Sequence, residues 1–166
     1  MSPSYRLAAQ SYVNLRRLLS ANHLRLGEIL QEADLISSSR VELALQAQTQ
    51  HPHLRLGEIL AMCNWLEPKT ADFFAQDWSN VIRQEHREPL GYYLQQAALL
   101  NESQIEQVLA EQRETGIRFG TVAVLQGFIK STTLDFFLMN LFPDDLNVSP
   151  FINMYSTTNF PLNSDS

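Results

Sequence analysis

Cysteine is nearly absent from the chain, since Cys63 is the only one in 166 residues. An internal disulfide is therefore excluded, and we expect a cytoplasmic protein. Long apolar runs are absent as well. No segment approaches the roughly 18 consecutive apolar residues of a membrane span, and the N-terminal stretch lacks the apolar run of a secretory signal.

Positive charge is scarce: 12 Lys and Arg residues against 18 Asp and Glu residues give a net charge of −6. Such a molecule repels nucleic acid and anionic membranes, so we expect no DNA or RNA partner. The apolar content of 45% is that of a soluble globular protein, and 166 residues are enough for a sizeable core.

The common catalytic and metal-binding signatures are missing. There is no phosphate-binding loop, no HExxH, no CxxC and no GxSxG, so we expect neither an enzyme nor a metal or cofactor. His51 and His53 flank a proline with no carboxylate in step, which is typical of a plain loop. We interpret Asp72 and Asp135 as partners of helix dipoles and Cys63 as a small core residue.

A repeat dominates what is present. The heptapeptide Leu-Arg-Leu-Gly-Glu-Ile-Leu occurs unchanged at 24–30 and 54–60, with weaker copies at 89–94 and 118–123. The glycines of the four copies are 30, 34 and 29 residues apart, about the length of two short helices with their turns. These glycines are Gly27, Gly57, Gly91 and Gly120.

Each copy has the pattern of a short helix, a sharp turn, an apolar pair and a longer helix. Asp34, Asn64 and Gly127 stand seven residues after their glycines, where the chain needs a left-handed residue to close the first helix. Ala98 is expected to be the exception. Residues 119–125 have some strand character, but their register with the other copies favours a helix. The sequence therefore predicts an all-α fold.

The true unit is a duplicated pair of copies. The second and fourth copies share Thr-x-Asp-Phe-Phe at 70–74 and 133–137, whereas the first and third end on Gln48 and Gln112. The predicted organisation is an N-terminal helix in 1–22, a first module in 23–80, a connector in 81–88, a second module in 89–142 and a flexible C-terminal tail in 143–166.

The Arg-Leu-Gly opening allows two interpretations. A glycine at the head of a short helix leaves backbone N–H groups bare for phosphate, and an arginine adds a planar fork suited to phosphate or to the O6/N7 edge of guanine. Alternatively, the glycine permits close helix packing, the leucine is core, and the arginine covers apolar surface with its stem. The residues alone leave both open.

The full frame, R-L-G-x-x-L followed by the turn, an apolar pair, L-x-x-x-L and a closing Gln, resembles the MshEN domain. That domain precedes the ATPase in type II secretion and type IV pilus assembly ATPases and binds cyclic di-GMP. The chain resembles two such modules in tandem without the ATPase. The resemblance implies ligand contacts in the first module from Arg25, Leu26, Gly27, Gln48, Arg55, Leu56 and Gly57.

The second module departs from this frame, because Pro89 stands in place of the first arginine and Phe119 lies inside the motif. Leu141 stands where the fourth copy would have the closing Gln, and Trp78 stands at the same position in the second copy, which belongs to the first module. The second module is therefore expected to hold a weaker site or none. That weaker site would comprise Gly91, Gln112, Arg118 and Gly120.

The resemblance implies a non-enzymatic protein that binds cyclic di-GMP in its first module and relays that state to a protein partner, in pilus, secretion or motility control. The alternative is a protein–protein interaction scaffold that keeps the repeat fold and has lost the nucleotide. Two intact Arg-Leu-Gly openings favour the first hypothesis, and the missing Arg and Gln positions favour the second.

Overall fold

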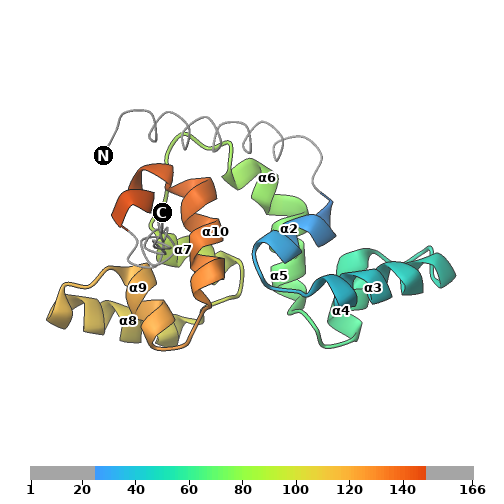
Figure 1. Ribbon diagram of the computed structural model, residues 1–166, viewed down its shortest axis with the longest axis horizontal. Helices are drawn as coiled ribbons and strands as arrows, with labels where there is room; N and C mark the ends of the chain where they lie inside the picture. Colours follow the sequence, from blue (N-terminus) through green and yellow to red (C-terminus); the bar gives the residue numbers. More distant parts are fainter. Residues whose placement is uncertain (1–24, 149–166) are drawn as a thin grey trace, which may run out of the picture.

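The computed structural model describes residues 25–148, and every regular element in that range is a helix (Figure 1). The predicted all-α fold is confirmed for this part of the chain. The helix expected in 1–22 and residues 149–166 of the expected tail lie outside the described residues. None of the described helices has the length and apolar character needed to cross a membrane.

Four seven-residue helices each begin one residue before a repeat glycine. The residue three positions after the glycine is completely buried in every case, at 0% exposure, and anchors the helix to the core. Residues 119–125 are helical, as their register with the other copies favoured. The four helices are α2 (Leu26–Glu32), α4 (Leu56–Met62), α7 (Leu90–Gln96) and α9 (Phe119–Leu125).

A residue with positive φ stands two positions after the end of each short helix, and Ala98 is no exception. Its φ is 54°, the same as that of Asn64, so the expectation for Ala98 was wrong. The Ala98 and Leu99 N–H groups donate to the carbonyls of Gln95 and Leu94, both at 2.9 Å. These bonds cap the free carbonyls of the last helical turn and hold the alanine in a conformation that an L residue rarely adopts.

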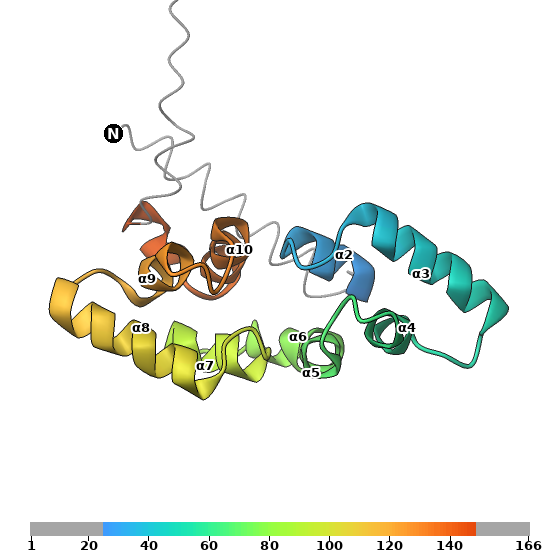
Figure 2. The same cartoon turned by 90° about the horizontal axis from the view of Figure 1, so that it is seen from below.

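The second helix of each copy has one of two positions (Figure 2). α3 (Ser38–Gln50) and α8 (Glu102–Thr115) lie at opposite ends of the molecule. Between them lie α10 (Ser131–Leu141) and a continuous helix that contains a π-helical turn in its middle. That continuous helix comprises α5 (Pro68–Asp72), η1 (Phe73–Asp77) and α6 (Trp78–Val81).

The two Thr-x-Asp-Phe-Phe frames meet at the centre of the molecule. Trp78 stacks on Phe136 with ring centroids 5.1 Å apart and an interplanar angle of 23°. Phe74 contacts both Phe136 and Phe137, at 6.1 Å in each case. Because aromatic pairs of this kind add to the energy of apolar burial, the frames join the two modules into one core.

Two buried threonines make reciprocal hydrogen bonds between the modules. The Thr70 hydroxyl donates to the Ala97 carbonyl at 2.7 Å, and the Thr133 hydroxyl donates to the Ala33 carbonyl at 2.8 Å. Ala33 and Ala97 are the C-cap residues of α2 and α7, where carbonyls have no partner within the helix. We call these two bonds the threonine clasp.

One side of the threonine clasp carries additional polar contacts. Thr132 donates to the Asp34 carboxylate at 2.7 Å, and the Lys130 ammonium lies 3.4 Å from the same carboxylate. The Thr132 hydrogen bond is the main cause of a lowered pKa for the Asp34 carboxyl, and the Lys130 charge lowers it further. Ala98, which occupies the same position in the third copy, has no side chain that could make such contacts.

Cys63 is exposed, so the interpretation of this residue as core was wrong. Ala33 and Ala97 occupy the same position in their copies and are completely buried. The difference follows from the fold, since α2 and α7 end against the opposite module and α4 does not. Gln126, the corresponding residue after α9, is exposed as well.

The segments expected to be a connector and a tail contain ordered contacts. Between α6 and α7, the Arg87 guanidinium donates to the carbonyl groups of Val81 and Ile82, the latter at 2.8 Å. Within the segment expected to be a flexible tail, residues 143–148 form a 3-10 helix, η2 (Pro143–Val148). The Asp145 N–H donates to the Phe142 carbonyl at 2.9 Å, which keeps η2 beside the end of α10.

Candidate functional site

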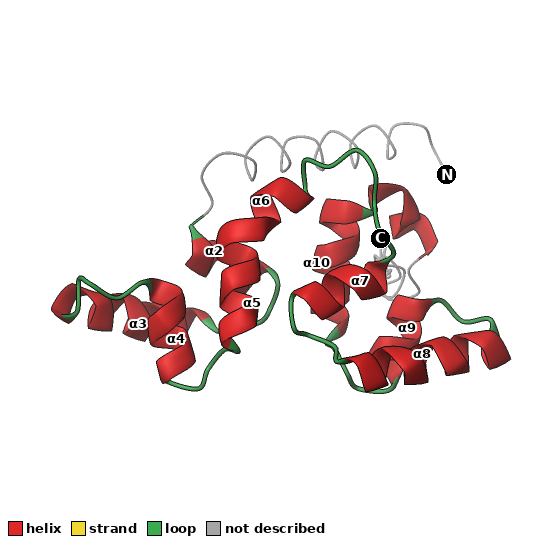
Figure 3. Cartoon of the chain, turned by 180° about the vertical axis from the view of Figure 1, so that it is seen from behind, coloured by secondary structure: helices red, strands yellow, loops and turns green. Residues whose placement is uncertain are grey.

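The first turns of α2 and α4 pack against each other. A Cβ added to Gly27 would lie 3.3 Å from Leu56, and one added to Gly57 would lie 3.4 Å from Leu26. Each leucine therefore covers the glycine of the other helix. The structure brings together four of the predicted ligand-binding residues where these two helices meet. Figure 3 shows from behind that α3 and α4 lie at one end of the molecule and α8 and α9 at the other.

Packing alone accounts for the two glycines of the first module. A Cβ on Gly27 would lie 2.8 Å from Val41 on α3, and a Cβ on Gly57 would lie 3.0 Å from Ala71 on α5. Both distances require a neighbour to move. The packing interpretation of the glycines thus has direct support, while their contact with a ligand stays a prediction.

Arg25 and Arg55 are exposed and immediately precede the two crossing helices. Their backbone N–H groups donate to the carboxylates of Glu28 and Glu58, at 3.0 and 2.6 Å, which caps the start of each helix. Neither guanidinium has an ion pair among the described residues. Two arginines thus remain available beside the positive ends of two converging helices.

Gln48 holds the loop that leads into the second copy. Its side-chain amide donates to the Leu54 carbonyl at 2.9 Å, immediately before Arg55. The closing glutamine of the first copy thus positions the start of α4. A ligand could still contact Gln48 through the amide oxygen or through the second N–H of the same amide.

Trp78 and Leu141 lie in the core at 3% and 2% exposure. The frame has a closing Gln at these positions, and the sequence suggested that its absence weakens the site. The structure explains the replacement of this Gln by apolar residues in another way. Because α6 and α10 are central helices, Trp78 and Leu141 face the junction of the modules. Gln48 and Gln112 are half-buried on the peripheral helices α3 and α8.

The second module has the same crossing with larger side chains. A Cβ on Gly91 would lie 2.9 Å from Phe119, and one on Gly120 would lie 3.1 Å from Leu90. The arginine that precedes α9, Arg118, lies 3.6 Å from the Asp145 carboxylate of η2. The positive charge expected at this weaker site is thus paired with an acid from within the chain.

A cavity of about 490 Å³ lies between α4 and the continuous helix α5–η1 of the first module. Arg55 and Gly57 line it, together with Asp72 and Gln76, which belong to no site predicted from the sequence. In the sequence, the sign of this cavity is the set of small residues on the two helices that face each other: Gly57, Ala61, Ala71 and Ala75. The rest of its wall is Leu54, Glu58, Ala61, Met62, Pro68, Ala71 and Ala75.

The matching cavity of the second module is smaller, at about 260 Å³. Leu134 and Leu138 line it where the first module has Ala71 and Ala75. Phe119 and Phe142 add aromatic surface, and the paired Arg118 and Asp145 supply its charged groups. This cavity is largely apolar and holds no unpaired arginine.

Asp135 corresponds to Asp72 in the repeat but has a different environment. One oxygen of the Asp135 carboxyl is buried without a hydrogen-bond partner, and desolvation raises the pKa of this group above its usual value. Asp72 is exposed and accepts a hydrogen bond from the Gln76 amide at 3.3 Å. Only the first module thus presents this carboxylate toward solvent.

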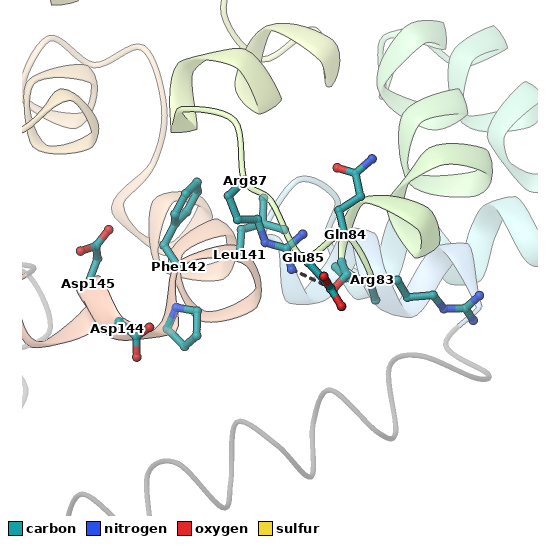
Figure 4. A pocket seen from close by; sticks show the side chains of 10 residues that line it. Arg83, Gln84, Glu85, Arg87, Leu141, Phe142, Asp144 and Asp145 are labelled. Atoms are coloured by element: carbon teal, nitrogen blue, oxygen red, sulfur yellow. Dashed lines mark hydrogen bonds between the residues drawn. The ribbon is translucent and has the colours of Figure 1, made fainter.

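A larger cavity of about 790 Å³ lies between the connector and η2 (Figure 4). Arg83, Glu85 and Arg87 line one side, and Asp144 and Asp145 line the other. None of the residues predicted for the ligand site of the first module lines it. Within residues 25–148, no group of three His, Cys, Asp or Glu side chains could hold a metal ion.

Comparison with known proteins identifies a relative. The chain is 37% identical over 139 residues to an uncharacterized protein of Picosynechococcus sp., and the match covers 84% of this chain and 74% of that protein. The chain belongs to the same family as that protein. No family model matches the sequence, and no solved structure matches it. Functional conclusions for the family therefore rest on the chemistry of the site.

Proposed function

We propose that the first module binds cyclic di-GMP and relays its presence to a protein partner, without catalysing a reaction. The observation that carries this proposal is the reciprocal packing of the first turns of α2 and α4, each preceded by an exposed arginine that makes no ion pair with the described residues. The resemblance of the Arg-Leu-Gly frames to MshEN domains supports the same ligand and points to a pilus or secretion component as the partner.

The two arginines determine the affinity for an anionic ligand, because the partial positive charge of the helix N-termini is offset by nearby carboxylates. Glu28 and Glu58 cap the starts of α2 and α4, and their carboxylates oppose the attraction of an anion to the backbone N–H groups. A guanidinium forms two parallel bonds with a phosphate or with the O6/N7 edge of guanine. Arg25 and Arg55 therefore supply the affinity that the short helices lack.

Isothermal titration with cyclic di-GMP tests the proposal on the full chain. Arg25→Ala and Arg55→Ala should each weaken binding about tenfold or more, because a hydrogen bond to a charged group is worth roughly 1.5–3 kcal/mol. Both variants keep the backbone N–H that caps the helix. Arg118→Ala is the matched control in the second module and should leave the affinity unchanged.

Two results would contradict the proposal. The absence of heat at tens of micromolar ligand would remove cyclic di-GMP as the ligand of the wild-type chain. Binding that depends on Arg118 and not on Arg25 or Arg55 would move the site out of the first module.

A protein–protein interaction scaffold is the second candidate function. It is favoured by apolar side chains exposed at matching positions of the two modules: Leu45 and Leu109 at 44% and 40%, and Met62 and Leu125 at 71% and 66%. Exposed pairs of this kind suit docking of a partner. If this candidate is right, a pulldown should recover the same partner with and without nucleotide.

A further inference from the structure

The cavity beside α4 is lined by two side chains of opposite charge that form no ion pair with each other. Arg55 and Asp72 both line it, and they make no ion pair. The Glu58 carboxylate, which also lines the cavity, is engaged by the Arg55 N–H at 2.6 Å. Asp72 accepts one long hydrogen bond from the Gln76 amide, at 3.3 Å, and its other oxygen accepts none from the described residues. The two charges therefore suit a ligand that offers a donor edge to Asp72 and an acceptor edge to Arg55.

Small residues make up much of the cavity wall. Ala61 and Ala75 carry only a methyl group and are accessible, so a planar ring can approach close to the backbones of α4 and η1. Gly57 and Ala71 pack closely against each other at the base of the cavity. Met62 and Pro68 add apolar surface. At about 490 Å³, the cavity is within the range of roughly 300–1,000 Å³ that is typical of small-molecule sites.

Among nucleic-acid bases, guanine fits this pair of charges. Its O6 and N7 atoms accept two bonds from an arginine, and its N1–H and N2–H₂ groups form a double donor that suits a carboxylate. Adenine presents an acceptor at N1 where guanine presents a donor. A carboxylate opposite that edge would reject adenine, because two acceptors would then face each other.

We propose that this cavity binds one guanine ring, with Asp72 accepting from N1–H and N2–H₂ and Arg55 donating to O6 and N7. Asp72 thereby determines base specificity. The inference deepens the proposed function, on which it rests for the rest of the ligand: one base of cyclic di-GMP enters the cavity, and Arg25 remains for the phosphates.

The second module lacks these features. Leu134 and Leu138 fill space that Ala71 and Ala75 leave open in the first module, and Arg118 is already paired with Asp145. The inference therefore assigns a guanine-reading cavity to the first module alone.

Titration of wild type, Asp72→Asn and Asp77→Asn with cyclic di-GMP, cyclic di-AMP, GMP and AMP tests this assignment. Asp77 is a matched control, since it is exposed on the same continuous helix and does not line the cavity. The wild-type chain should prefer each guanine nucleotide over its adenine counterpart at least tenfold. Asp72→Asn should lower guanine affinity at least tenfold and spare adenine affinity, and Asp77→Asn should match wild type.

The outcomes separate the inference from the proposed function. If cyclic di-GMP binds and Asp72→Asn keeps the full guanine preference, the inference is wrong and the proposed function stands. If GMP binds in an Asp72-dependent manner and cyclic di-GMP does not bind, the proposed function is wrong and the guanine cavity stands. If none of the four nucleotides binds, both are wrong.

Discussion

Replacing Thr70 or Thr133 with valine removes one hydroxyl of the threonine clasp and changes little else in shape. Both residues are almost completely buried, at 1% and 2% exposure. Their acceptors, the carbonyl groups of Ala97 and Ala33, close the ends of α7 and α2. Each substitution therefore leaves a buried carbonyl without its donor at the junction of the modules.

The expected loss of stability is about 1–2 kcal/mol for each substitution. A buried polar group that loses its partner costs roughly 1–3 kcal/mol. The methyl group gained by valine returns up to about 0.8 kcal/mol through apolar burial. The two bonds share no partner, so Thr70→Val and Thr133→Val combined should cost about 2–4 kcal/mol.

Urea unfolding followed by circular dichroism measures this difference, and each kcal/mol should lower Tm by roughly 3–5 °C in a domain of this size. Thr49→Val is the matched control, because the Thr49 hydroxyl donates to the Gln46 carbonyl at 2.7 Å at an exposed position. It should change stability by less than about 0.5 kcal/mol. If the buried variants unfold at the same urea concentration as this control, the threonine clasp does not stabilise the fold.

Three further predictions concern single residues. Ala98→Gly should stabilise the protein in urea unfolding, by up to about 1 kcal/mol, because glycine adopts the φ of 54° without the cost of a Cβ; a loss of stability would contradict the left-handed turn. Gly120→Ala should destabilise by about 1–2 kcal/mol in the same assay, since the new Cβ would lie 2.5 Å from buried Leu134, and an unchanged midpoint would show that the leucine can move aside. Asp135→Asn should gain in Tm relative to wild type as the pH rises above 3.8, because the raised pKa of Asp135 means that the wild-type fold favours the protonated acid and loses stability as the acid ionises; a pH-independent Tm difference would contradict this.

The sequence predicted the helices well because each depends on its own residues. The spacing of three and four and the repeat register indicated α2, α4, α7 and α9, including the helix at 119–125. It failed at Ala98, where backbone hydrogen bonds and the burial of the following apolar pair outweigh the preference of one residue. It also failed at Cys63, because the repeat gave no sign of which helix ends face the other module.

The site was harder to predict because it depends on how copies are placed in space. The repeat gave Arg25, Arg55 and the two glycines, and the structure brings the openings of both copies together. Asp72 was interpreted as a partner of the helix dipole, since its cavity arises only when α4 packs on α5. Trp78 was interpreted as a lost ligand contact, since the central position of α6 cannot be read from a repeat alignment.

The threonine clasp also constrains the order in which the chain can fold. Thr133 lies 100 residues after Ala33 in the sequence. The carbonyl of Ala33, at the C-cap of α2, can therefore accept its hydrogen bond only after α10 has packed against α2. During synthesis, the aromatic residues of the first module therefore stay exposed until most of the second module has left the ribosome and α10 can pack on them. Contacts this distant in sequence favour slow, cooperative folding, in which neither half is complete without the other.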